Sequence, residues 1–143
     1  MDAKIIAGIL AAGGAALAAG GVYRMNKKTG YFKKGNSVRY DVSRIPFKKT
    51  SPLKGKTVVF LGSSVTKGFA AHNNAFAEYI EKKDSCICIK EAVNGTTLID
   101  NCEDSYIERM RDNLDPERQV DLFICQLSTN DATRNSPLGE ISE

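Results

Sequence analysis

Three short apolar runs in the second half of the sequence constrain the fold most strongly. They are Thr57–Gly62 (TVVFLG), Cys86–Val93 (CICIKEAV) and Asp121–Leu127 (DLFICQL). Each is rich in the β-branched and aromatic residues that favour strands, and successive runs begin roughly 30 residues apart, the size of a strand–helix–strand unit. The pattern therefore predicts parallel strands joined by right-handed helical crossovers.

Helical periodicity fills the two intervals between these runs. Apolar residues recur on one face over Phe69–Lys83 and again over Ile99–Leu114, where Pro116 ends the pattern. The expected fold class is α/β, with a parallel sheet in a flavodoxin-like three-layer α/β/α arrangement. Only the first three strands of such a sheet are present.

The N-terminal region contains 18 uncharged, mostly apolar residues from Ile5 to Val22. A helix of this length measures about 27 Å, close to the hydrocarbon thickness of a bilayer. We expect residues 1–23 to form a single-pass transmembrane anchor that precedes the sheet. The main alternative is a cleaved signal peptide, because residues 16–18 (ALA) fit the small-x-small cleavage pattern. A buried soluble helix fits less well, because the segment has no polar face.

The charge is divided unevenly along the chain. Residues 1–56 contain 12 Lys and Arg against two Asp, whereas residues 57–143 contain 15 acidic residues against eight Lys and Arg. Basic residues beside a membrane span are attracted to anionic head groups. Residues 24–56 are therefore predicted to be a juxtamembrane linker that contacts the lipid surface. A solvated linker is the alternative, and nucleic acid is not an expected partner, because no aromatic platform accompanies the charge.

Small polar residues follow each of the three predicted strands. They are Ser63 and Ser64, then residues 94–97 (NGTT), then residues 128–131 (STND). The carboxyl ends of parallel strands meet at one edge of a sheet, where ligands usually bind. A hydroxyl on a tight strand-to-helix turn, surrounded by glycine N–H and asparagine amide donors, is typical of acyl transfer.

Together these segments resemble the SGNH, or GDSL-like, hydrolases over residues 57–143, the N-terminal part of that domain. The resemblance implies that Ser64, in GSSVTKG, is the nucleophile. It also implies that the N–H groups of Ser64 and Gly95 and the side chain of Asn130 form the oxyanion hole. The expected function is a membrane-anchored serine hydrolase of carboxylic esters, whether small molecules, lipids or acylated carbohydrates. The family chemistry involves no cofactor and no metal.

The sequence departs from the family pattern in three ways. Ser63 replaces an aspartate of the first block, and Ser128 replaces a glycine of the third. The family's general base, a histidine three residues after an aspartate, has no counterpart before Glu143. We therefore expect these residues to be the N-terminal portion of a larger hydrolase, with little activity of their own. The single histidine, His72, is not expected to be the base, because it lies eight residues along the following segment from Ser64.

Other interpretations stay open. The chain could be a catalytically inactive binding or scaffold fragment of the same fold. It could also be a flavodoxin-like module that binds a nucleotide or flavin, although Thr66 stands where a phosphate loop requires its second glycine. Cys86 and Cys88 share one side of a predicted strand, but buried thiols are expected there rather than a metal site.

Two further points concern helix caps and location. Ser63, Ser64 and Thr66, and likewise Thr129 and Asp131, could simply cap helices. The expected location is the membrane. The excess of Lys and Arg after the apolar segment favours a cytoplasmic site, whereas the family resemblance favours the outside.

Overall fold

A computed structural model describes residues 3–72, 74–100, 103–127 and 129–137, and gives only the backbone for residues 3–13, 35 and 38. Along the chain its elements are α1 (Ala3–Thr29), the 3₁₀ turns η1 (Lys34–Asn36), η2 (Val38–Tyr40) and η3 (Val42–Arg44), β1 (Thr57–Gly62), α2 (Ser64–Lys67), α3 (Phe76–Asp84), β2 (Ile87–Ala92), α4 (Tyr106–Asp112), β3 (Leu122–Cys125) and α5 (Asn130–Thr133).

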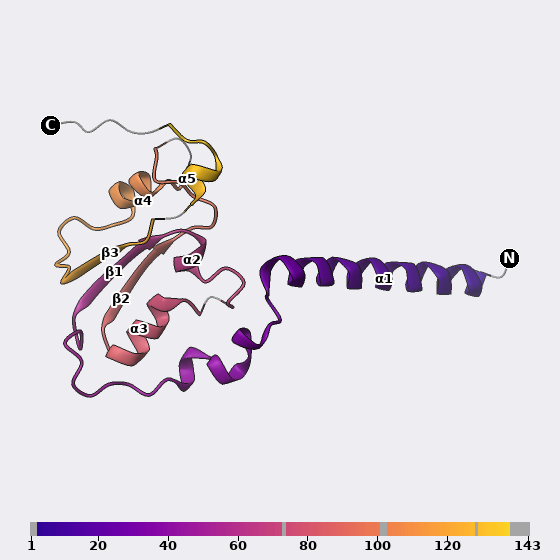
Figure 1. Ribbon diagram of the computed structural model, residues 1–143, viewed down its shortest axis with the longest axis horizontal. Helices are drawn as coiled ribbons and strands as arrows, with labels where there is room; N and C mark the ends of the chain where they lie inside the picture. Colours follow the sequence, from indigo (N-terminus) through magenta and orange to yellow (C-terminus); the bar gives the residue numbers. More distant parts are fainter. Residues whose placement is uncertain (1–2, 73, 101–102, 128, 138–143) are drawn as a thin grey trace.

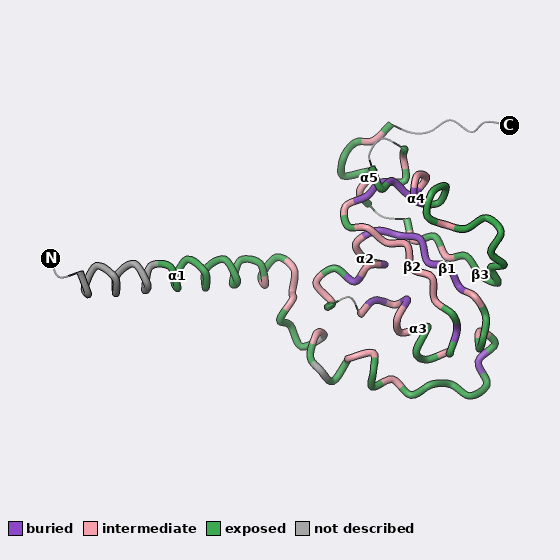
Figure 2. The backbone as a smooth tube through the Cα atoms, turned by 180° about the vertical axis from the view of Figure 1, so that it is seen from behind, coloured by how far each residue is buried: buried purple, intermediate pink, exposed green. Residues whose placement is uncertain are grey.

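The strands form a parallel sheet in the order β2-β1-β3. Val58 of β1 pairs with Cys88 of β2 and with Leu122 of β3. This confirms the predicted α/β class and the parallel pairing. β1 has the predicted bounds, whereas β2 and β3 are shorter than their apolar runs. β1 is buried along most of its length and β3 is mostly exposed (Figure 2).

Helices α3 and α4 lie on opposite sides of the sheet (Figure 1). On the α3 side, Phe76, Ala77 and Ile80 pack with Val58 and Phe60 in the hydrophobic core. The rings of Phe60 and Phe76 meet edge to face, with centroids 5.7 Å apart. This apolar packing fixes α3 on the sheet, as the burial of one helical face predicts.

Both helices between the strands are shorter than the periodicity predicts. α3 begins at Phe76 rather than Phe69, because the chain between α2 and α3 turns sharply. Ala70 and His72 have φ values of 62° and 53° there, and left-handed backbone cannot continue an α-helix. α4 begins at Tyr106, where the preceding residue caps it: Ser105 Oγ accepts a hydrogen bond from the N–H of Glu108 at 3.1 Å.

The chain between α1 and β1, which contains most of the basic residues of 24–56, runs past α3 (Figure 1). Its Lys48 N–H donates to Lys83 O at 2.6 Å, and Ser51 Oγ donates to Asp84 Oδ1 at 2.7 Å. The side-chain amide of Asn36 donates to the backbone oxygen of Ala70. These residues are therefore held against the end of α3 and the loop before it, while their contact with lipid stays a prediction.

Helix α1 extends away from the sheet as one long rod (Figure 1). Its side chains from residue 14 to residue 25 are exposed. Among the residues that the structure describes, no helix combines the length and the apolar character needed to cross a bilayer. The side chains of residues 3–13, part of the predicted span, lie outside the described residues. The transmembrane anchor is not supported by the described residues and stays a prediction.

Candidate active site

The predicted nucleophile, Ser64, is the first residue of α2 and follows β1 after a single residue. The N–H groups of Gly68 and Phe69 donate to Ser64 O at 3.1 and 2.9 Å, which closes a one-turn helix. Gly68 ends that turn with a φ of 84°, a conformation that glycine adopts without strain. Ser64 is half-buried. The sequence therefore places this hydroxyl on a tight strand-to-helix turn, as predicted.

Close packing under this turn explains why a glycine, Gly62, stands at the end of β1. A Cβ at Gly62 would lie 1.9 Å from Thr66 Oγ1, so no larger residue fits there. The buried Thr66 hydroxyl donates to Gln126 Oε1 at 3.0 Å, which ties the turn to the chain after β3. Thr66 is therefore a link between segments rather than a helix cap.

Ser63 does not cap α2 either. It occupies the N-cap position, but its side chain makes no capping hydrogen bond. Its Oγ is buried and has no hydrogen-bond partner in the described part of the chain. The capping interpretation of Ser63 is therefore wrong.

Gly95 lies in the loop after β2 and has a φ of 75°. This left-handed conformation favours glycine over residues that carry a Cβ. The loop is held from both sides: Thr96 Oγ1 donates to Val93 O at 2.9 Å, and Arg134 Nη2 donates to Gly95 O at 2.7 Å. The predicted oxyanion glycine is thus fixed in a defined loop.

Asn130 is the first residue of α5, and it contacts the Gly95 loop directly. Its Nδ2 donates to Thr96 O at 2.8 Å. Its neighbour Asp131 accepts hydrogen bonds from the N–H groups of Leu98 at 2.9 Å and Ile99 at 3.1 Å. Asp131 therefore clamps the loop after β2 rather than capping its own helix. Thr129, at the N-cap position of α5, also makes no capping side-chain hydrogen bond.

The described residues of all three predicted segments lie at the carboxyl end of the sheet, where α2 and α5 begin (Figure 1). Ser128 lies outside the described residues. The segment after β3 is the connection between the other two. It bonds the Ser64 turn through Gln126 and Thr66, and it bonds the Gly95 loop through Asn130 and Thr96. The structure therefore brings the segments of Ser64, Gly95 and Asn130 together through these neighbouring contacts.

Arg109 is the functional candidate that the sequence analysis missed. It lies on α4, is only 1% exposed, and reaches the carboxyl ends of two strands. Its Nη1 donates to Glu91 O at 2.8 Å, and its Nη2 donates to Gly62 O at 3.0 Å. The available signal was its position one turn after Tyr106, on the face of the helix that turns inward. Met110 is one of the apolar residues at helical spacing in the predicted helix Ile99–Leu114, but it is 45% exposed.

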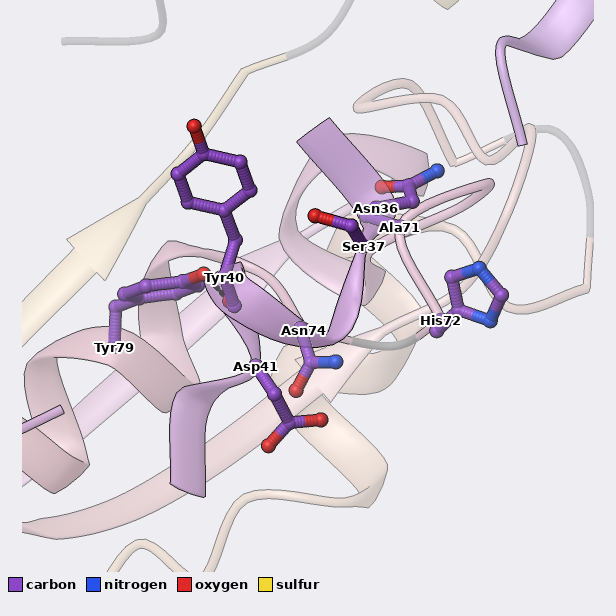
Figure 3. Close-up of a pocket in the computed structure, with 8 residues that line it drawn as sticks. All are labelled: Asn36, Ser37, Tyr40, Asp41, Ala71, His72, Asn74 and Tyr79. Atoms are coloured by element: carbon purple, nitrogen blue, oxygen red, sulfur yellow. Dashed lines mark hydrogen bonds between the residues drawn. The ribbon is translucent and has the colours of Figure 1, made fainter. Parts of the chain in front are cut away.

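His72 lies away from the nucleophile, on the loop between α2 and α3. Its Nε2 is 3.3 Å from Tyr31 O, and its ring centroid is 4.1 Å from that of Tyr31. In the described part of the chain no hydrogen bond joins it to Ser64. It lines one end of a hollow of about 270 Å³, with Tyr40 and Tyr79 at the other end (Figure 3). The remaining lining residues are Asn36, Ser37, Asp41, Ala71 and Asn74.

The described cysteines are protonated thiols at neutral pH. Burial raises the pKa of Cys86 and Cys125, and it raises the pKa of Cys88 to about 12. Cys102 lies outside the described residues. Within the described ranges, no group of three or more His, Cys, Asp or Glu side chains is placed to hold a metal ion.

The described contacts bring a serine turn, a glycine loop and an asparagine amide to the same edge of the sheet. Backbone and amide N–H groups are the donors that such an edge can offer to a ligand. Such donors stabilise a negative charge that develops on an oxygen atom. Comparisons of the chain with family models, with curated proteins and with solved structures give no match.

Proposed function

We propose that residues 57–143 form the nucleophile-bearing part of an SGNH-type serine hydrolase that acts on carboxylic esters. The observation that carries this proposal is the hydrogen bond from Asn130 to Thr96 O, directly beside Gly95 and at the same sheet edge as the Ser64 turn. The strand order β2-β1-β3 supports it, because a doubly wound, flavodoxin-like sheet begins with this order.

In the proposed reaction, Ser64 Oγ attacks the ester carbonyl carbon and forms a new C–O bond. The π electrons of the carbonyl move to its oxygen, where the N–H groups of Ser64 and Gly95 and the amide of Asn130 stabilise the charge. The tetrahedral intermediate expels the alcohol, which receives the proton that a base removed from Ser64. Water then hydrolyses the acyl-enzyme by the same steps.

None of the described hydrogen bonds joins Ser64 Oγ to a general base. The sequence has one histidine, and its ring packs on Tyr31 rather than on Ser64. An external base such as imidazole can replace it in a test of the nucleophile.

We also propose that residues 1–23 anchor the protein in a membrane and that residues 24–56 contact anionic lipid. The basic side chains Arg24, Lys27 and Lys28 are exposed at the end of α1, directly after the apolar segment. Each basic residue near an anionic surface adds about 1 kcal/mol of binding. This arrangement favours esters of lipids or acylated carbohydrates near a membrane as substrates.

A fluorophosphonate probe tests the proposed function directly. The full chain is incubated with the probe, with and without imidazole, and compared with the Ser64→Ala and Ser63→Ala variants. We expect imidazole-stimulated labelling that Ser64→Ala abolishes and Ser63→Ala retains. Equal labelling of the Ser64→Ala variant, or none in the unsubstituted chain, argues for a non-catalytic binding fragment instead.

A further inference from the structure

The buried guanidinium of Arg109, on α4, contacts several segments of the candidate site. Besides its bonds to Gly62 O and Glu91 O, Nη2 donates to Thr96 Oγ1 at 3.2 Å. Its Nε donates to Asp104 O at 2.8 Å, on its own side of the sheet. One side chain therefore contacts the last residue of β1, the end of β2 and the loop that carries Gly95.

This contact is unusual because Arg109 has no carboxylate partner. Among the described residues no Asp or Glu forms a salt bridge with it, although Glu103, Asp104, Glu108 and Asp112 line the same hollow as Arg109. Carbonyl and hydroxyl dipoles face the positive charge of this guanidinium instead. The planar fork of donors fixes the directions of those acceptors as well as their distances.

Thr96 connects Arg109 to the predicted oxyanion donor. Its hydroxyl accepts from Arg109 and donates to Val93 O, while its backbone oxygen accepts from Asn130 Nδ2. A shift of Thr96 would therefore move the amide of Asn130. Arg109 also holds the backbone oxygen of Gly62, two residues before Ser64.

We propose that Arg109 is a positioning residue for the oxyanion site. It holds Thr96 and the end of β1 in register, so that Gly95 and Asn130 face the same substrate oxygen as Ser64. The buried positive charge also favours the anionic tetrahedral state over the neutral ester. Its effect on turnover rests on the proposed function, whereas its control of Asn130 does not.

The test uses the ¹⁵N-labelled full chain and the variant Arg109→Lys, with Arg111→Lys as the matched control. Arg111 lies on the same helix, but it is exposed, and its described ion pairs with Asp100 and Asp112 lie at the surface. Lysine keeps the charge and lacks the planar fork. We expect the Asn130 side-chain amide signals to shift in Arg109→Lys and to stay in place in Arg111→Lys.

A second readout is the affinity for phenylboronic acid, which forms an anionic tetrahedral adduct with a serine hydroxyl. We expect Arg109→Lys to weaken this adduct about tenfold or more while circular dichroism and cooperative unfolding show a folded protein. If Arg109→Lys does not fold, Thr96→Val removes the same hydroxyl contact and is expected to shift the same amide signals.

Unchanged Asn130 signals and unchanged boronate affinity in folded Arg109→Lys would overturn the proposal. A loss of stability alone, with the Asn130 signals in place, would also overturn it, because that outcome indicates a purely structural role. Shifted Asn130 signals in a chain that never forms the boronate adduct would support the positioning role and refute the proposed hydrolase.

Discussion

The two faces of the sheet are built from different chemistry. On one face, α3 packs through apolar side chains against Val58 and Phe60. On the other, α4 inserts Tyr106 and Arg109, which bond to backbone oxygens at the strand ends. Apolar packing is non-directional, whereas hydrogen bonds fix angles and register. The comparison indicates that the α3 face supplies stability and the α4 face supplies the geometry of the candidate site.

The largest expected effect tests the apolar face. Phe60→Ala leaves a cavity beneath α3 and should lower the free energy of unfolding by about 3–5 kcal/mol. Phe123→Ala is the matched control. Because Phe123 is 44% exposed, its removal should lower the free energy of unfolding much less. Chemical denaturation measures both values. Equal losses for the two variants would remove the distinction between a packed α3 face and an exposed edge.

A smaller effect tests the polar face. Tyr106→Phe keeps the buried ring and removes the hydroxyl that donates to Gln126 O at 2.9 Å. The free energy of unfolding should fall by about 1 kcal/mol. Because Gln126 also bonds Thr66 under the Ser64 turn, the ¹⁵N signals of residues 64–66 should shift as well. A loss of stability with those signals unchanged would contradict the assignment of this face to site geometry.

Removal of one hydroxyl at the carboxyl end of β1 should maintain or raise the stability instead of lowering it. Ser63 Oγ is buried without a partner in the described residues, so Ser63→Ala removes an unsatisfied polar group. We expect the midpoint of denaturation to stay the same or rise. The gain in the free energy of unfolding should not exceed about 1–3 kcal/mol. Ser64→Ala serves as the neighbouring comparison. A clear loss of stability in Ser63→Ala would show that this hydroxyl has a partner in solution.

The smallest effect concerns the amino ends of the strands. Asp121 accepts from Lys56 Nζ and from Thr57 N, both at 2.8 Å, and the hydrogen bond from Lys56 is the main cause of its lowered pKa. A carboxyl whose pKa is lower in the folded state stabilises above its unfolded pKa of about 3.9 and loses that effect as the pH falls further. Asp121→Asn should therefore flatten the decline of stability below about pH 4.

Features set by neighbouring residues could be predicted from the sequence, whereas features set by residues far apart in the sequence could not. β1 could be bounded correctly, because its β-branched run ends at Gly62 and two serines. The start of α3 could not, because Ala70 and His72 adopt positive φ without the glycine that usually signals it. Arg109 was missed for a different reason: its acceptors lie on strands far away in the sequence, so only the folded sheet shows why a charge is buried there.

The proposed mechanism requires Ser64, Gly95 and Asn130 to act on one oxygen atom. The most direct measurement adds phenylboronic acid to the ¹⁵N-labelled full chain and follows the Gly95 backbone N–H and the Asn130 side-chain amide. We expect both signals to shift together with one dissociation constant, and neither to shift in Ser64→Ala. Movement of only one of them, or the same shifts in Ser64→Ala, would contradict a shared oxyanion site.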